Sequence, residues 1–126
     1  VVRSYVSIPL IAILGVLVAG VVKSNPFDGT YKPSGQEYSH WNCKTVGQVG
    51  GAISISGREV LGLGTHCSLD NPVTIRGIEA ILYDADCAGE GYQWSERVII
   101  GKADYGLFYA TKEGVTKWEN CNFRRN

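Results

Sequence analysis

The sequence predicts an all-β domain, either a small antiparallel barrel or a sandwich closed by disulfides, preceded by one transmembrane α-helix. Three observations lead to this prediction: an apolar run near the N-terminus, a period-two pattern of apolar residues after residue 26, and four widely spaced cysteines. The chain has 126 residues, which suits one domain, since domains typically hold about 100–150 residues.

The apolar run covers residues 5–22 and contains no charged side chain. A helix rises about 1.5 Å per residue, so a run of about eighteen residues nearly crosses the hydrocarbon core of a bilayer. A cleaved signal peptide is the alternative, because Arg3 before the run and the small residues Ala19 and Gly20 also suit one. The length of the run favours retention. We therefore expect a cytoplasmic N-terminus (1–4), a transmembrane helix (5–22) and a short polar linker (23–26).

Charge and cysteine usage predict the compartment. Arg3 lies before the run, whereas Lys23 after it is soon followed by Asp28, so the positive-inside rule places the N-terminus in the cytoplasm. The cysteines all follow the run and include no C-x-x-C pair, which favours disulfides over zinc. We expect a single-pass protein of a bacterial inner membrane, with residues 27–126 as a periplasmic β domain.

Alternation of apolar and polar residues predicts the strands. Ile53 and Ile55 alternate with Ser54 and Ser56, which is typical of a half-buried strand, and a turn at Gly57 leads to a hairpin partner at 59–63. Further candidate strands are 29–32, 42–46, 73–76, 79–84, 96–102, 107–111 and 115–119. Eight or nine short strands without a helical stripe predict an antiparallel barrel or sandwich.

The cysteine positions favour one of three possible pairings. A closed barrel brings its first and last strands together, so Cys43 is expected to pair with Cys121. Cys67 is then left for Cys87, a bond that fastens an expected long loop at 68–72. The other two pairings stay open.

Several function classes find little support in the composition. Twelve basic and twelve acidic residues cancel, so the chain has no excess of positive charge for nucleic acid. The acidic string with Asp84, Asp86 and Glu90 offers oxygen ligands for calcium, but it lacks the closing acid of a calcium loop and reads better as a solvated loop. A carboxylate pair for glycoside hydrolysis requires two acids that face each other, which the sequence does not reveal.

The histidines are the remaining catalytic candidates. His40 and His66 lie near Ser39 and Ser68, but neither serine sits in a G-x-S-x-G turn. The sequence therefore predicts no enzyme, and it predicts no catalytic residue, metal, cofactor or small-molecule substrate.

Two sets of residues are candidates for partner contacts. Tyr92 and Trp94 lie in a glycine-rich stretch that we expect to be a loop, where they either anchor a partner protein or pack over the barrel mouth. Ala12, Gly15 and Ala19 share one face of the predicted membrane helix and permit close approach of a neighbouring helix in the bilayer.

Four strings resemble segments of a group of alphaproteobacterial periplasmic or membrane-anchored proteins with a small β domain. They are F-D-G-T-Y-K-P at 27–33, W-N-C at 41–43, G-G-A-I-S-I at 50–55 and I-L-Y-D-A-D-C-A-G-E-G at 81–91. The resemblance supports the compartment and the architecture and implies no activity.

The chain is also distantly similar to membrane-bound inhibitors of C-type lysozyme, which are small disulfide-closed β-barrels. Trp41-Asn42-Cys43 stands where that family has Y-x-C, and Cys121 ends the domain. The stretch Gly89–Tyr92 matches the G-x-x-Y of its loop, with Ala88 in place of the preceding serine. This similarity implies a tethered periplasmic inhibitor.

The function expected from the sequence is that of a non-catalytic accessory or stabilising subunit of a bacterial membrane protein complex. A photosynthetic reaction centre–light-harvesting complex or a respiratory complex is the expected setting, with its subunits and the lipid bilayer as partners. The alternative is a membrane-tethered periplasmic inhibitor or ligand-binding β-barrel.

Overall fold

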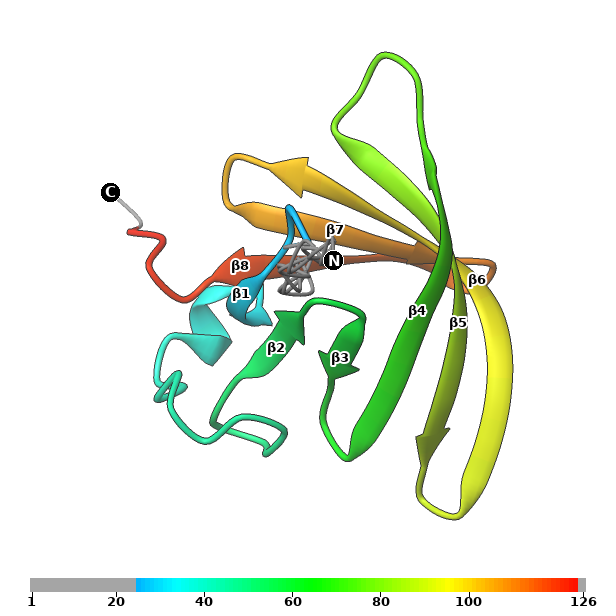
Figure 1. Cartoon of the computed structure of the whole chain (residues 1–126). Coiled ribbons are helices and arrows are strands. Elements are labelled where there is room, and N and C mark those ends of the chain that lie inside the picture. Colours follow the sequence, from blue (N-terminus) through cyan, green and yellow to red (C-terminus); the bar gives the residue numbers. More distant parts are fainter. Residues whose placement is uncertain (1–24, 125–126) are drawn as a thin grey trace, which may run out of the picture.

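The structure, a computed structural model, describes residues 25–124 and is an eight-stranded antiparallel barrel (Figure 1). The strands are β1 (Gly29–Pro33), β2 (Ile53–Ser56), β3 (Glu59–Leu61), β4 (Thr65–Thr74), β5 (Ala80–Gly89), β6 (Tyr92–Ala103), β7 (Gly106–Thr111) and β8 (Gly114–Asn120). One 3-10 helix, η1 (Gln36–Tyr38), interrupts the loop between β1 and β2. The predicted all-β class is confirmed, and the barrel replaces the sandwich alternative.

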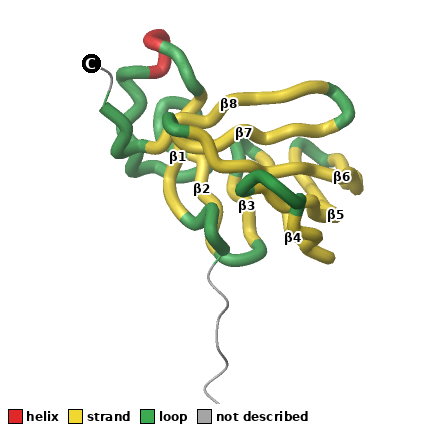
Figure 2. The backbone as a smooth tube through the Cα atoms, turned by 90° about the horizontal axis from the view of Figure 1, so that it is seen from above, coloured by secondary structure: helices red, strands yellow, loops and turns green. Residues whose placement is uncertain are grey.

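Each strand pairs with its neighbours in sequence, and β1 closes the sheet by pairing with β8 (Figure 2). The closing ladder joins Tyr31 to Asn120 and Pro33 to Trp118. Short turns connect β5 through β8, as an up-and-down order requires.

The interior is filled by apolar side chains that alternate with outward-facing residues. Ile53 and Ile55 of β2 point inward as the alternation predicts, and they meet Leu69, Ile100 and Leu107 from strands across the barrel. Burying a side chain of this size contributes roughly 1.5–3 kcal/mol. The packed side chains leave the outer surface and the open ends of the barrel for binding.

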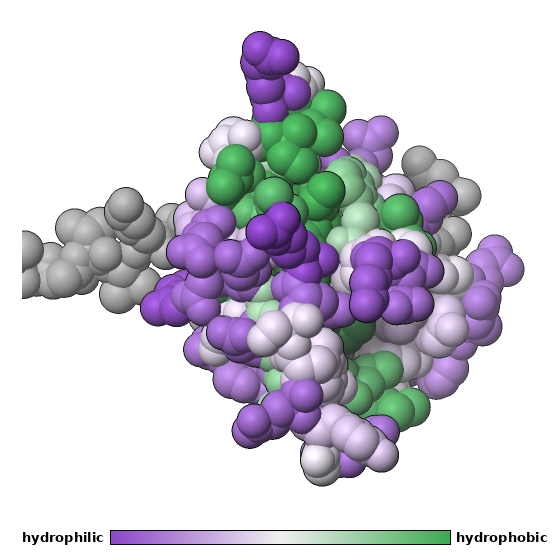
Figure 3. Space-filling model, turned by 90° about the vertical axis from the view of Figure 1, so that its right-hand side faces the viewer, coloured by the Kyte–Doolittle hydropathy of each residue, from purple (hydrophilic) through white to green (hydrophobic). Residues whose placement is uncertain are grey.

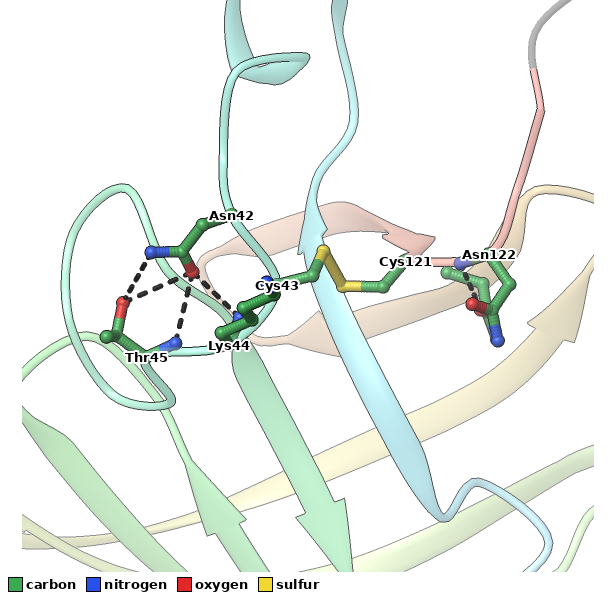
Figure 4. Close-up of a disulfide and its surroundings, with 7 residues drawn as sticks. Asn42, Cys43, Lys44, Thr45, Cys121 and Asn122 are labelled. Carbon is green, nitrogen blue, oxygen red and sulfur yellow. Dashed lines mark hydrogen bonds between the residues drawn. A yellow bond between two sulfur atoms is a disulfide. The ribbon is translucent and has the colours of Figure 1, made fainter.

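Both predicted disulfides are present. Cys43 is bonded to Cys121 with 6.0 Å between the Cα atoms, and Figure 4 shows the bond joining a loop to the residue that follows β8. The Asn42 side chain shapes that loop, because its Oδ1 accepts hydrogen bonds from the backbone N–H groups of Lys44 (2.7 Å) and Thr45 (3.0 Å). Cys67 is bonded to Cys87.

Two predicted local features were wrong. Residues 42–46 form a loop whose one ladder contact is the bridge from Val46 to Ala52, because the Asn42 turn replaces strand pairing there. Residues 68–72, expected as a loop, belong to β4. The turn-forming Asn71 and Pro72 occupy a bulge in that strand, where Asn71 takes a φ of 52° and the register shifts between Asp70 and Val73.

The predicted membrane span, with Ala12, Gly15 and Ala19, lies outside the described residues. Within residues 25–124, no helix has the length and hydrophobicity needed to cross a bilayer. The described chain begins at Asn25, whose side-chain amide donates to the Gly57 carbonyl (2.9 Å) and to the Tyr83 hydroxyl (3.2 Å). These bonds fix the point at which the domain meets the preceding chain.

Candidate functional site

The hairpin of β5 and β6 holds the two aromatic residues that the sequence analysis proposed as anchors. Gly89 pairs with Tyr92, so only Glu90 and Gly91 form the turn, and both have positive φ (51° and 80°) as a type I′ turn requires. The expectation of a glycine-rich loop was therefore wrong: Tyr92 and Trp94 are strand residues at the start of β6.

Tyr92 and Trp94 lie on the face of β6 that continues into the core. Trp94 is directly opposite Cys87, a buried core residue, and Cys87 is bonded to Cys67 on β4. Side chains two residues apart on a strand share a face, so Tyr92 lies on this face too. Trp94 is 36% exposed and Tyr92 is 73% exposed. The strand that carries them pairs with β5, which the disulfide links to β4, while the two rings remain accessible.

The start of β6 has a strand neighbour on one side only. β5 pairs with β6 from Tyr92 to Gly101, but β7 pairs with it only from Ile99 to Ala103. The segment Tyr92–Val98, named here the free edge, therefore borders no strand on the side where β7 lies farther along. Figure 1 shows this part of β6 extending past the end of β7.

The register shows which backbone groups point away from β5. A two-residue turn makes Gly89 and Tyr92 a hydrogen-bonded pair, and such pairs alternate with non-hydrogen-bonded pairs along an antiparallel ladder. Trp94 therefore bonds to β5, as does every second residue after it. The N–H and C=O groups of Gln93, Ser95 and Arg97 point outward from the free edge. Ile99, next in this set, uses the same groups to pair with β7.

A shallow depression adjoins the free edge. It has a volume of about 540 Å³, and Gln93, Trp94 and Ser95 of β6 line it together with His66 and three β5 residues, Asp86 to Ala88. Figure 3 views the molecule from the β6 side and shows one group of hydrophobic residues toward the end that carries the β4–β5 turn and a smaller one toward the opposite end, with polar residues over much of the face between them. The free edge thus combines two exposed rings with polar surroundings.

Carboxylates outnumber cations around the hairpin. Asp84 forms an ion pair with Arg97 (3.4 Å), and Asp86 accepts a hydrogen bond from the Ser95 hydroxyl (2.6 Å). Glu90 lies in the turn. Glu96 is half-buried on the inner face. Within residues 25–124, neither of these two glutamates forms an ion pair.

Tyr109 of β7 lies within the electrostatic reach of Glu96. Burial raises the pKa of Tyr109 to about 12, and the nearby negative charge of Glu96 acts in the same direction. Tyr109 also stacks on Trp118, with 4.7 Å between the ring centroids. The neutral phenol is part of the packing beside the free edge.

The acidic residues proposed as possible calcium ligands do not converge. Asp84 and Asp86 are exposed on the outer face, where each already has a partner, and Glu90 lies beyond them in the turn. Across residues 25–124, no three of the His, Cys, Asp and Glu side chains are placed to share a metal ion.

The histidines do not form a nucleophile pair with the nearby serines. His66 contacts the Glu59 carboxylate through Nε2, and the Ser68 hydroxyl lies 3.5 Å from the other oxygen of the same carboxylate. Catalysis by a Ser-His pair needs the imidazole on the hydroxyl, but here the carboxylate lies between them. His40 and Ser39 lie in the loop after η1.

A second depression lies where the chain enters the barrel. Its volume is about 330 Å³, and its lining includes the apolar residues Pro26, Phe27, Ile78, Ala80 and Ile81. It is the more apolar of the two depressions. No sequence pattern predicts it, because its residues come from three separate segments.

Sequence reasoning found the aromatic residues of the hairpin but missed the free edge. The predicted strands 96–102 and 107–111 left the start of β6 in a loop, so no difference in strand length was visible. One signal was available: Tyr92 and Trp94 alternate with Gln93 and Ser95 in a pattern that suits a strand.

Comparisons of the chain with protein families, with curated proteins and with solved structures find no match to any of them.

Proposed function

We propose that this protein is a non-catalytic, membrane-tethered accessory subunit that docks onto a membrane protein complex through its β5–β6 hairpin. The observation that carries the proposal is the pair Tyr92 and Trp94, two exposed rings on one face of a strand that the Cys67–Cys87 bond supports. Aromatic residues of this kind supply much of the binding energy at protein interfaces, each on the order of 2 kcal/mol when fully buried by a partner.

The tether is the second part of the proposal. The uncharged run at residues 5–22 ends three residues before Asn25, where the described domain begins. A linker this short keeps the domain within about 10 Å of the bilayer surface, since an extended residue spans about 3.5 Å. The two disulfides are consistent with an oxidising compartment such as the periplasm.

Co-purification from native membranes tests the docking. The full chain, its Trp94→Ala and Tyr92→Ala variants and a Gly15→Leu variant are expressed, solubilised in mild detergent and separated by size. We expect the parent chain to migrate with a large complex and each variant to be depleted from it several-fold. Exposed Val49, in the loop between η1 and β2, provides the control Val49→Ala. A parent chain that migrates alone contradicts the proposal.

A second candidate function is a tethered module that binds a small apolar ligand, and the 330 Å³ apolar depression favours it. In this case a fluorescent apolar probe added to the full chain in micelles should bind saturably, and Ile78→Asp should abolish that binding. Absence of saturable binding to the parent chain removes this candidate. Calorimetric titration with C-type lysozyme tests the inhibitor variant of the same idea.

A further inference from the structure

We infer that the free edge of β6 is a strand-addition site, which binds an extended, basic segment of a partner protein through backbone hydrogen bonds. This inference rests on the proposed function and deepens it, because it states how the partner is held and what chemistry the bound segment has.

Three alternate residues of the free edge carry unused backbone groups. Gln93, Ser95 and Arg97 present three N–H and three C=O groups outside both ladders of β6, and no hydrogen bond within the described chain uses them. An extended peptide laid along the free edge would continue the sheet in the place that β7 occupies farther along. Addition of a strand to an exposed edge is a general mode of peptide recognition.

The free edge lacks much of the usual protection against other strands. Proteins blunt exposed edges with proline, bulges, short strands or a covering loop. The free edge is part of a twelve-residue strand, contains no proline and shows no register shift against β5. Its charged residues are Glu96 and Arg97, and Arg97 is already paired with Asp84. The edge is therefore available for pairing and retains one unpaired acidic group.

The side chains of the free edge favour particular residues in the incoming strand. Residues of that strand alternate between the two faces of the sheet. Those on the inner face meet Trp94 and Glu96, so an apolar residue beside the ring and a lysine or arginine beside the carboxylate fit there. Those on the outer face meet Gln93 and Ser95, which also line the 540 Å³ depression, and this suits polar residues. Glu90 in the turn adds to the negative field, so a basic segment is favoured over an acidic one.

The experiment selects peptides against the full chain. A displayed library of random decapeptides is selected on the parent protein in lipid nanodiscs, and the enriched peptides are synthesised. Binding is then measured to the parent chain, to Ser95→Pro and to Ser95→Ala. Proline removes an N–H that the fold does not use, whereas alanine keeps that N–H and loses only the hydroxyl bond to Asp86.

We expect enriched peptides to alternate in polarity, to carry lysine or arginine, and to lose at least tenfold in affinity for Ser95→Pro but less than threefold for Ser95→Ala. Glu96→Gln should weaken binding and reduce its salt dependence. Hydrogen exchange gives a residue-level readout: the bound peptide should slow exchange at least tenfold at the amides of Gln93, Ser95 and Arg97. The Trp94 and Glu96 amides should change little, because they already bond to β5.

Three results overturn the inference: a selection without enrichment, enriched peptides that bind Ser95→Pro as tightly as the parent chain, and enriched peptides rich in acidic residues. A dimer of the parent chain that Ser95→Pro dissociates also overturns it, because the occupant of the edge is then a second copy. Failure here is separable from failure of the docking proposal. If Trp94→Ala leaves the native complex while Ser95→Pro remains in it, docking through the hairpin stands and strand addition does not.

Discussion

Trp94 lies directly opposite Cys87, which is buried and forms the disulfide with Cys67. The indole is therefore on the same face as the buried disulfide but is partly exposed at the start of β6. The ring is thus held from one side and accessible from the other. Replacing it should remove a contact surface while leaving the core largely intact.

The first prediction compares this ring with a true core residue. Trp94→Ala should lower the free energy of unfolding by less than about 2 kcal/mol, whereas Leu107→Ala, at a fully buried position, should lower it by about 2–5 kcal/mol. Urea unfolding of the full chain in micelles, followed by near-ultraviolet circular dichroism, measures both. A Trp94→Ala loss as large as that of Leu107→Ala would assign the ring to the core.

The second prediction tests the direction of the backbone groups along β6. Ser95→Pro should cost less than about 1 kcal/mol, because its N–H is outside the ladders. Glu96→Pro should cost about 2 kcal/mol or more, because the N–H of Glu96 donates a hydrogen bond to β5 and proline removes it. Thermal unfolding of both variants beside Ser95→Ala and Glu96→Ala gives the comparison. Equal losses would show that the register of the hairpin is not as described.

The third prediction ranks the two disulfides. Cys43 and Cys121 are 78 residues apart in sequence, and Cys67 and Cys87 are 20 apart. In the chain-entropy description, the longer loop contributes about 4.5 kcal/mol and the shorter about 3.3 kcal/mol. Replacing Cys43 and Cys121 by alanine should therefore destabilise the domain more than replacing Cys67 and Cys87. Chemical denaturation of the two double variants checks the order.

The fourth prediction is loss of stability at alkaline pH. Burial raises the pKa of Tyr109 from 10.0 to about 12 in the folded protein. Below about pH 10 the phenol is neutral in both states, so its contribution to stability is complete. Between about pH 10 and 12 only the unfolded chain ionises, and stability falls. Tyr109→Phe should flatten this loss, and absorbance at alkaline pH should show a late-titrating tyrosine that this variant lacks. Burial also raises the pKa values of Tyr31 and Tyr83, which provide the comparison.

The sequence was sufficient for the all-β class of the described domain and for most of its strands, because alternation reflects burial on one face. The sequence was insufficient where the local conformational preference of a segment differs from the strand pairing that the whole fold imposes on it. Asn71 and Pro72 favour a turn, yet pairing of β4 with β5 on both sides of them keeps the chain extended through a bulge. The disulfide partners followed from closure of the barrel, although Cys43 itself lies in a loop.

The free edge could not be predicted, because it depends on where β7 stops relative to β6. No single segment encodes that difference; it arises from the register of two strands and the position of the turn at Lys112 and Glu113. The aromatic residues of the site were visible in the sequence, but their support by Cys87 required the register as well.

The Cys43–Cys121 bond makes a covalent ring that contains β2 through β8 and leaves β1 outside. A cut in any loop within that ring leaves a single covalent molecule. β1, in contrast, has no covalent link to the ring other than the chain itself, and it is held by its ladders to β2 and β8 and by the buried Tyr31. It is also the first strand that the chain reaches after Asn25, so a force applied through the N-terminal segment loads β1 first. Mechanical extension should peel this one strand away and then stop at Cys43, with the rest of the barrel locked by its covalent ring.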